Sequence, residues 1–356
     1  MSAERFHALE PRITVADVVP REIPGWAAVD RTASAIVGHD CLGVPSVRVG
    51  LGWTLEYLGM RRHRDHVLLP KFVGRCILNS LSRYALPVEH PTPETRAVVV
   101  VDQYGLRHDH DAMMAECRRN DWVCLEDSPY GLGHEEGVAP GSLARFIGLG
   151  KILPVAQGAL VLSRDGAILD FIRRKRAEWS GWSWLVWGAI AALRMRRAVS
   201  SYSALADAAY EMYVPARGGN VALRANMLRG LARVSADTIV HETRLRRLAS
   251  RLGSHVLMPD LRRLAYVVPF VPGPALDAAR AAFRRTGFDP TVYHVDVHRN
   301  PFDPSYVRTL LIPVNVRVPD RDFDALTECL ARLVEESPGP LLPSTATVNA
   351  IADRRP

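Results

Sequence analysis

The chain has 356 residues, of which 48% are hydrophobic and 23% charged, and its formal net charge is +7. This composition is ordinary for a soluble globular protein, and the length predicts two domains rather than one. Arginines are spread along the chain, so we expect solvated surface charge and no nucleic-acid site. Five scattered cysteines exclude a disulfide framework, and the N-terminus lacks an apolar signal segment, so we expect a cytoplasmic protein.

The first part of the chain predicts an arm followed by a large domain. Residues 1–45 are rich in Pro and Gly with weak periodicity, and we expect an arm that packs on another unit. From residue 46 to 235, strand and helix patterns alternate, which predicts parallel βαβ units. In chain order these patterns are a short helix at 54–60, a strand at 66–70, a four-valine strand at 95–101, a helix at 109–121, and strands at 122–127 and 158–163.

A Trp- and Arg-rich segment, residues 171–213, is interpreted as an insertion in the large domain. It holds four of the seven tryptophans, and its apolar run of about 15 residues is too short to cross a bilayer as a helix. Three interpretations stay open. The segment 173–197 could contact the inner face of a membrane peripherally, form a dimer contact, or belong to the core.

Residues 236–340 predict a small α+β domain, and residues 341–356 a loosely held tail. Helical patterns come first, and strand, helix, strand and helix patterns follow. Strand alternation predicts that His294, Asp296 and His298 share one face, and a role in substrate binding is one interpretation of the two histidines. The clusters "HRDH" and "RHDHD" lack the spacing of metal ligands, so we predict no metal site.

One lysine stands out in a chain that otherwise uses arginine. Of 45 basic residues only three are lysine, and Lys151 lies in a nearly apolar stretch, residues 142–166. Asp127 ends a predicted strand, where parallel sheets bind ligands. A desolvated lysine can act as a neutral nucleophile, and a carboxylate can hold a protonated pyridine nitrogen, which are the two groups that pyridoxal phosphate (PLP) needs. A snorkelling lysine and a solvated aspartate are the alternative.

Five segments, in order, resemble the DegT/DnrJ/EryC1/StrS family of PLP-dependent sugar aminotransferases. They are "VVVVDQYGLRHDHDAM", "WVCLEDSPYGLG", "GSLARFIGLGKIL" with "QGALVLS", "GGNVALRANMLRGLARV" and "VRTLLIPVNVRVPDRDFDALTECL". The resemblance implies the type I fold of PLP-dependent transferases. In that fold a large α/β domain has a mostly parallel mixed sheet flanked by helices, and a small C-terminal α+β domain follows.

The resemblance also implies roles for single residues. Lys151 stands at the position of the cofactor-binding lysine, and Asp127 at that of the pyridine-binding aspartate. Asn220 stands where the family's asparagine reaches the phosphate in the neighbouring subunit, so a homodimer with shared sites is expected. The implied reaction is transamination of a keto nucleotide-sugar with glutamate as the usual donor, in saccharide or antibiotic-sugar biosynthesis.

Several positions depart from the family's cofactor cradle. Tyr130 stands where a Gln usually lies against the ring, Phe146 replaces a phosphate-binding Ser, and the usual stacking aromatic falls near Gly74. The best match to the phosphate turn is a stretch whose backbone N–H groups we expect at a helix start: Gly50, Leu51 and Gly52. These departures keep open a degenerate member with altered PLP chemistry or a non-catalytic binding or scaffold role.

Overall fold

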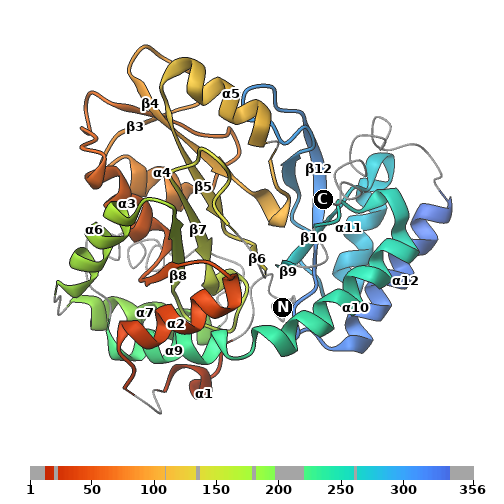
Figure 1. Cartoon of the computed structure of the whole chain (residues 1–356). Helices are drawn as coiled ribbons and strands as arrows, with labels where there is room; N and C mark the ends of the chain where they lie inside the picture. The colour runs from red at the N-terminus through yellow and green to blue at the C-terminus, as the bar shows by residue number, and fades with distance from the viewer. Residues whose placement is uncertain are drawn as a thin grey trace.

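The computed structural model describes two packed units joined by a long helix (Figure 1). The described residues are 13–19, 23–108, 110–133, 137–178, 182–196, 220–259 and 263–336. A seven-stranded sheet with its helices forms the large unit, and a three-stranded sheet with three helices forms the small one.

The large sheet is mixed and mostly parallel. Its order is β1-β8-β7-β5-β4-β2-β3, and β8 runs antiparallel to both of its neighbours. All other pairs are parallel. The strands are β1 (Cys41–Val44), β2 (His66–Leu68), β3 (Leu86–Val88), β4 (Thr95–Val101), β5 (Val123–Ser128), β7 (Ala144–Gly148) and β8 (Ala159–Ser163). This sheet confirms the predicted fold class.

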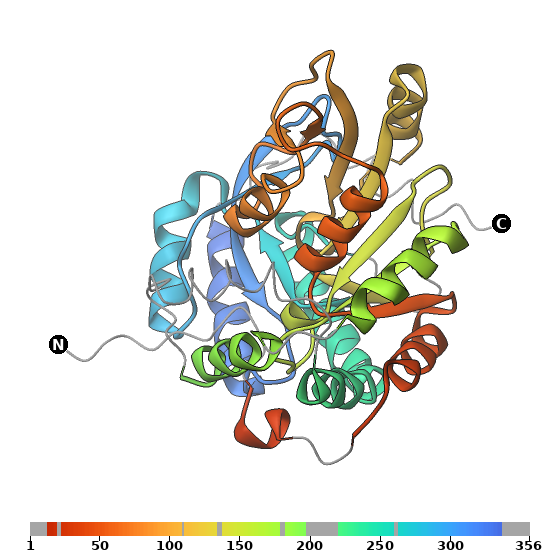
Figure 2. The same cartoon turned by 90° about the vertical axis from the view of Figure 1, so that its left-hand side faces the viewer.

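Helices cover both faces of the sheet. In Figures 1 and 2, α3 and α6 lie on the side turned away from the small unit. Ser46 and Asp165 cap these two helices by accepting hydrogen bonds from Val49 and Ala167. The helices of this unit are α1 (Val15–Val18), α2 (Trp26–Val37), α3 (Val47–Tyr57), α4 (Arg75–Leu81), α5 (His110–Asn120), α6 (Gly166–Ala177), α7 (Trp182–Arg196) and α9 (Val221–Leu231), with short 3-10 turns η1 (Gln103–Gly105) and η2 (Leu149–Lys151).

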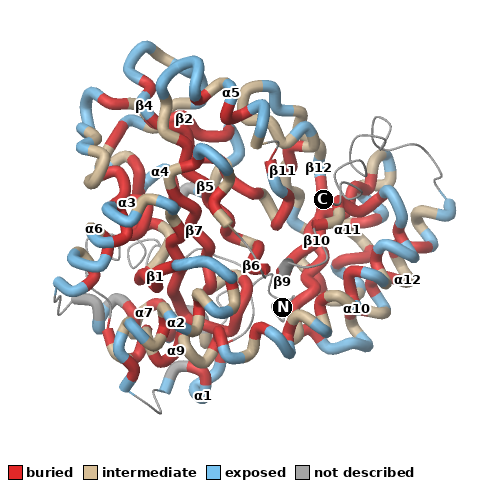
Figure 3. The backbone as a smooth tube through the Cα atoms, in the orientation of Figure 1, coloured by how far each residue is buried: buried red, intermediate tan, exposed pale blue. Residues whose placement is uncertain are grey.

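The four-valine run of β4 explains why the sheet needs helices on both sides. Val99 packs into the core beneath α3 and α6, whereas Val98 and Val100 pack with Met113 and Met114 of α5. A strand buried on both faces has no polar alternation, which is typical of parallel sheets. Buried residues, coloured red in Figure 3, run through the centre of the large unit.

The small unit is formed by the part of the chain that follows α9. Its sheet is antiparallel in the order β10-β12-β11, and α10, α11 and α12 share one core with it. A two-stranded ladder of β6 with β9 ties the two units together. The elements are β6 (Gly131–Gly133), α10 (Val234–Leu252), η3 (Gly253–His255), β9 (Arg263–Ala265), β10 (Val267–Phe270), η4 (Gly273–Ala275), α11 (Leu276–Arg285), β11 (Tyr293–Asp296), β12 (Tyr306–Pro313) and α12 (Asp320–Glu336).

The structure bears on two segments for which the sequence was ambiguous or misleading. Residues 1–45 do not all form a separate arm, because β1 is the edge strand of the large sheet and α2 packs beside it. In the Trp-rich segment, Trp187 is buried in the core, whereas Trp184 is about half exposed. Among the described helices none is long and apolar enough to cross a membrane.

The cations before α7 are engaged within the protein. Arg176 is buried, lies 2.5 Å from Asp30, and donates to the Gly43 carbonyl. Lys175 lies 2.5 Å from Glu56. These ion pairs leave fewer charges for an anionic membrane than the sequence run suggests, so contact through 173–197 stays a prediction. Trp179 lies outside the described residues.

Candidate active site

Asp127 and Lys151 lie at one edge of the large sheet. Asp127 is near the carboxyl end of β5 and faces Phe146 of the neighbouring parallel strand β7. The chain leaves β7 at Gly148 and turns at once into η2, which ends at Lys151. The two residues therefore lie at the same edge, where parallel α/β sheets bind ligands, and close enough for the Lys151 charge to act on Asp127.

The Lys151 amine contacts Tyr130. Its Nζ atom donates a hydrogen bond to the Tyr130 hydroxyl at 3.3 Å and lies 4.3 Å from the centroid of the ring. The Tyr130 ring in turn packs on Tyr104, with centroids 5.1 Å apart, and Tyr104 packs on Tyr293 at 6.0 Å. A group of tyrosines from both units thus surrounds one side of the lysine.

The Asp127 carboxyl is buried and lacks a complete set of partners. It is 2% exposed, and among the described residues its Oδ1 atom has no hydrogen-bond partner. Burial raises the pKa of Asp127 to about 7; the charge of Asp102 acts in the same direction, and the charge of Lys151 opposes it. An oxygen in this state can accept a hydrogen bond from a ligand with a protonated nitrogen.

A buried ionic cluster fixes the end of β5 beside Asp127. Arg145 of β7 is about 1% exposed and donates to the Asp102 carboxylate at 2.8 Å. Ser128 donates to the same carboxylate at 2.6 Å, and Glu126 lies 3.5 Å from Arg145. Sequence reasoning missed this cluster. Its only signal was an arginine inside the apolar stretch "ARFIG".

The predicted phosphate turn at Gly50, Leu51 and Gly52 is wrong. These residues lie inside α3, which begins at Val47 after the capping Ser46, and the Gly50 N–H donates to the Ser46 carbonyl. Inside an α-helix each N–H donates to the carbonyl four residues earlier, so these amides are not free to bind a phosphate. A Cβ at Gly50 would lie 3.1 Å from Phe146, so this glycine serves close packing of helix on sheet.

The true start of α3 lies beside the lysine turn. A Cβ at Gly148 would lie 3.4 Å from the Val47 side chain, which places the first turn of α3 next to the segment leading to Lys151. Phe146 is fully buried in the core of the large unit and offers no donor there. Gly74 caps α4.

Asn220 and the two histidines lie in different settings. Asn220 is buried and caps α9 by accepting the Leu223 N–H at 2.8 Å. His294 stacks on Phe72, with centroids 4.5 Å apart and planes 12° apart. Gln103, the residue before Tyr104, donates to the Phe72 carbonyl at 3.1 Å, which ties this stack to the active-site edge.

His298 does not share a strand face with His294. β11 ends at Asp296, whose carboxylate accepts the backbone N–H of His298 at 3.1 Å and organises the loop that follows. The His298 side chain is exposed, and its Nδ1 atom lies 3.0 Å from the backbone carbonyl oxygen of Asp303. The alternation argument fails there because the strand is shorter than expected.

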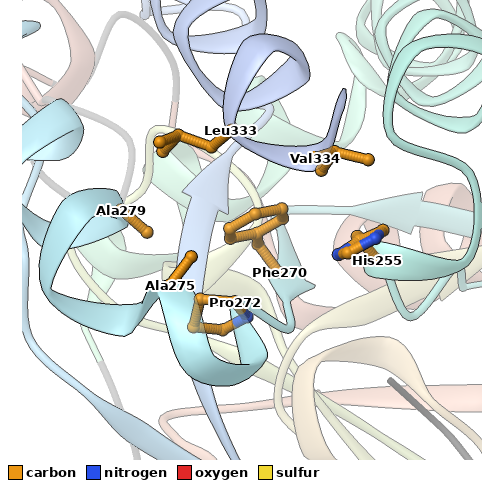
Figure 4. Close-up of a pocket in the computed structure, with 7 residues that line it drawn as sticks. All are labelled: His255, Phe270, Pro272, Ala275, Ala279, Leu333 and Val334. Atoms are coloured by element: carbon orange, nitrogen blue, oxygen red, sulfur yellow. The ribbon is translucent and has the colours of Figure 1, made fainter. Parts of the chain in front are cut away.

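Among the described residues, no group of three or more His, Cys, Asp or Glu residues is placed to hold a metal ion. A small pocket lies in the other unit, between α11 and α12 (Figure 4). Phe270, Ala279 and Leu333 line it, and His255 lies at its edge. Its lining is largely apolar and it contains neither Lys151 nor Asp127, so we place the active site at the sheet edge.

Comparison with known proteins identifies the fold. No family model and no curated protein matches the sequence. Solved structures that are similar over most of their length include PseC of Helicobacter pylori, an aminotransferase of pseudaminic acid biosynthesis (11% identity, TM-score 0.63, 94% of this chain and 100% of that one). They also include a protein of Streptococcus pneumoniae assigned as a sugar aminotransferase and solved in its PMP form (13%, 0.63, 93% and 98%), and a DegT DnrJ EryC1 StrS aminotransferase of Brucella abortus (15%, 0.58, 87% and 91%).

These similarities establish the fold. The chain has the type I fold of these aminotransferases, which confirms at the level of fold the resemblance drawn from its motifs. Function has to be argued from the site itself.

Proposed function

We propose that the protein is a PLP-dependent aminotransferase of the DegT/DnrJ/EryC1/StrS type that acts on a keto sugar. The observation that carries the proposal is that Lys151 lies within electrostatic range of a buried Asp127 carboxyl, one oxygen of which has no hydrogen-bond partner in the described chain. PLP requires both an amine and a carboxylate at one site, and the fold places ligands at this edge.

The residues at the sheet edge fit the cofactor. Asp127 would hold the protonated pyridine nitrogen, because its orphaned oxygen accepts a hydrogen bond and its negative charge would then gain a partner. Lys151 would bind the aldehyde carbon through its amine. When bound, PLP withdraws electrons from the substrate carbon and so makes its proton acidic.

The protein groups around Lys151 and Asp127 would orient these two side chains, and the Lys151 amine would transfer protons. Lys151 Nζ is the atom that accepts and returns a proton once its amine is neutral. The Arg145 guanidinium neutralises Asp102 and the Ser128 hydroxyl donates a hydrogen bond to it, so the end of β5 that carries Asp127 stays in one position. The tyrosines at 104 and 130 exclude water from one side of the amine.

Substrate and assembly are the finer parts of the proposal. Glutamate as amino donor, a keto nucleotide-sugar as acceptor and a role in saccharide biosynthesis come from the family resemblance. We also propose a homodimer in which Asn220 serves the partner's site, since it begins α9 as the family's asparagine does. Light scattering should give twice the chain mass. A monomer that binds PLP would contradict this part.

One observation favours the second candidate, a family member with altered chemistry or only a binding role. Phe146 is fully buried where the family has a phosphate-binding serine. The loss of a charge-assisted hydrogen bond to phosphate weakens binding by about 1.5–3 kcal/mol. The start of α3 would then be the main support for a phosphate group.

Borohydride trapping distinguishes the two candidates. The purified protein is incubated with PLP, reduced with borohydride and digested, and the phosphopyridoxyl group is located by mass spectrometry. Label on Lys151 is expected in the wild type and in Lys71→Arg, the matched control, and none in Lys151→Arg, since a guanidinium cannot form the imine. Label on Lys71 or Lys175 alone, or no label with excess PLP, would overturn the proposal.

Glutamate then tests turnover. Addition of glutamate to the PLP-loaded wild type should convert the bound cofactor to its amine form and change the visible spectrum. If the label forms on Lys151 but no amino donor changes the spectrum, the second candidate holds.

A further inference from the structure

The contact between Lys151 and Tyr130 joins two favourable interactions on one amine. The Nζ atom is 3.3 Å from the hydroxyl and 4.3 Å from the ring centroid, so it lies over the ring near its hydroxyl edge. A hydroxyl lone pair and the face of an aromatic ring both stabilise an ammonium more than a neutral amine.

Tyr130 is itself held in place. It stands between β5 and β6, and β6 pairs with β9 of the small unit. Its ring packs on Tyr104, whose backbone has φ of 55° in the left-handed region, a conformation that only a well-determined turn maintains. The hydroxyl therefore presents a fixed acceptor to the lysine.

We propose that Tyr130 is a positioning residue for Lys151, holding its Nζ atom at one place and governing how readily the amine releases a proton. The inference rests on the proposed function, because it concerns the same lysine. Tyr130 stands at the position where the family resemblance puts a Gln against the cofactor ring, and in this chain its hydroxyl contacts the reacting nitrogen instead.

Other groups also act on the lysine charge. Asp127 attracts it, and the tyrosine at 104 also lies within electrostatic range. Burial raises the pKa of Tyr104, with Tyr130 acting in the same direction, so Tyr104 is neutral at ordinary pH. Tyr130→Phe removes the hydroxyl acceptor but keeps the ring, the burial and both other groups.

The chain is well suited to a direct test because it has only three lysines. Protein labelled with ¹³C-lysine, without PLP, gives three Cε resonances, and Lys151→Arg assigns the one of interest. In Tyr130→Phe we expect the pKa of Lys151 to fall by about half a unit to one unit, a three- to tenfold rise in neutral amine, typical of one lost charge-assisted hydrogen bond near the surface. Tyr130→Leu, which also removes the ring, should lower it further.

Tyr57→Phe is the matched control, since it removes a hydroxyl that lies 3.3 Å from Asp165 on the helical side of the large unit. It should leave Lys151 unchanged, and Lys71 should not move in any variant. A Lys151 pKa that is unchanged or raised in a folded Tyr130→Phe protein would overturn the proposal. The titration needs no cofactor, so its result is independent of whether PLP labels the lysine.

Discussion

Replacing Asp127 by Asn should stabilise the PLP-free protein at neutral and higher pH. Burial raises the pKa of Asp127 to about 7, with a contribution from Asp102 and opposition from Lys151. In the unfolded chain the carboxyl titrates near about 3.9. Between these values the folded protein binds the extra proton, so its stability falls as pH rises through this window and stays low above it.

The size of this effect follows from the pKa difference. About three units correspond to about 4 kcal/mol, at about 1.4 kcal/mol per unit. The pKa of about 7 already includes the opposing effect of Lys151. Because the carboxyl of the unfolded chain is partly ionised at pH 4, slightly less than the full amount develops between pH 4 and pH 8. We therefore expect the difference in unfolding free energy between Asp127→Asn and wild type to grow by about 2–4 kcal/mol from pH 4 to pH 8.

Urea unfolding of both proteins at several pH values from 4 to 8 measures this difference. Asp65→Asn is a control of opposite sign: burial raises the pKa of Asp65, but hydrogen bonds from Arg61 and the charge of Arg96 outweigh it, so the net pKa is lowered. That variant should be less stable than wild type at neutral pH, and the loss should shrink in acid. Parallel pH curves for Asp127→Asn and wild type would refute the reasoning.

Two further predictions concern packing in the large unit. Arg176→Met should lower the unfolding free energy in urea by about 2–4 kcal/mol, because it leaves Asp30 partly buried without its cation; an unchanged midpoint would contradict this. Gly230→Ala should lower it by about 1–3 kcal/mol, since the new Cβ would lie 2.4 Å from Val155. Gly188→Ala should be neutral or slightly stabilising, because Gly188 lies in a helix and a Cβ added there would have no atom within 4 Å. Equal effects at both glycines would count against the packing argument.

Local pattern was sufficient for most of the fold. The valine run of β4 and the order of strands and helices predicted a parallel sheet, and the structure confirms it. β7 was harder to predict because the charged Arg145 lies within it. A charged residue in a strand core is acceptable only with partners from distant segments, here Asp102 and Glu126, and a single sequence does not reveal those partners. The strand β1 was missed for a different reason, because it lies in a Pro- and Gly-rich region with weak periodicity.

The candidate site was predictable only in part. Lys151 and Asp127 could be selected because residue type and strand order were enough to place them. The start of α3 was misplaced because glycines were given more weight than Ser46, whose side chain caps the helix. The contact of Tyr130 with Lys151 depends on side-chain rotamers and on the left-handed turn at Tyr104, neither of which leaves a pattern in the sequence.

Asp102 and Asp127 lie side by side at this edge, and their surroundings differ in a way that packing alone does not explain. Asp102 has both a buried arginine and a serine hydroxyl on its carboxylate, as a structural carboxylate should. Asp127 is equally buried, yet within the described chain its Oδ1 atom has no partner. An unpaired buried oxygen destabilises the fold by about 1–3 kcal/mol. A residue that serves only the fold would be expected to lose this penalty by substitution to an apolar residue such as Leu. The unpaired oxygen is explained if its partner is a ligand. A protonated ring nitrogen would donate a hydrogen bond to this oxygen and favour the charged carboxylate. The free energy that the unpaired oxygen costs the ligand-free fold would then be recovered when the ligand binds.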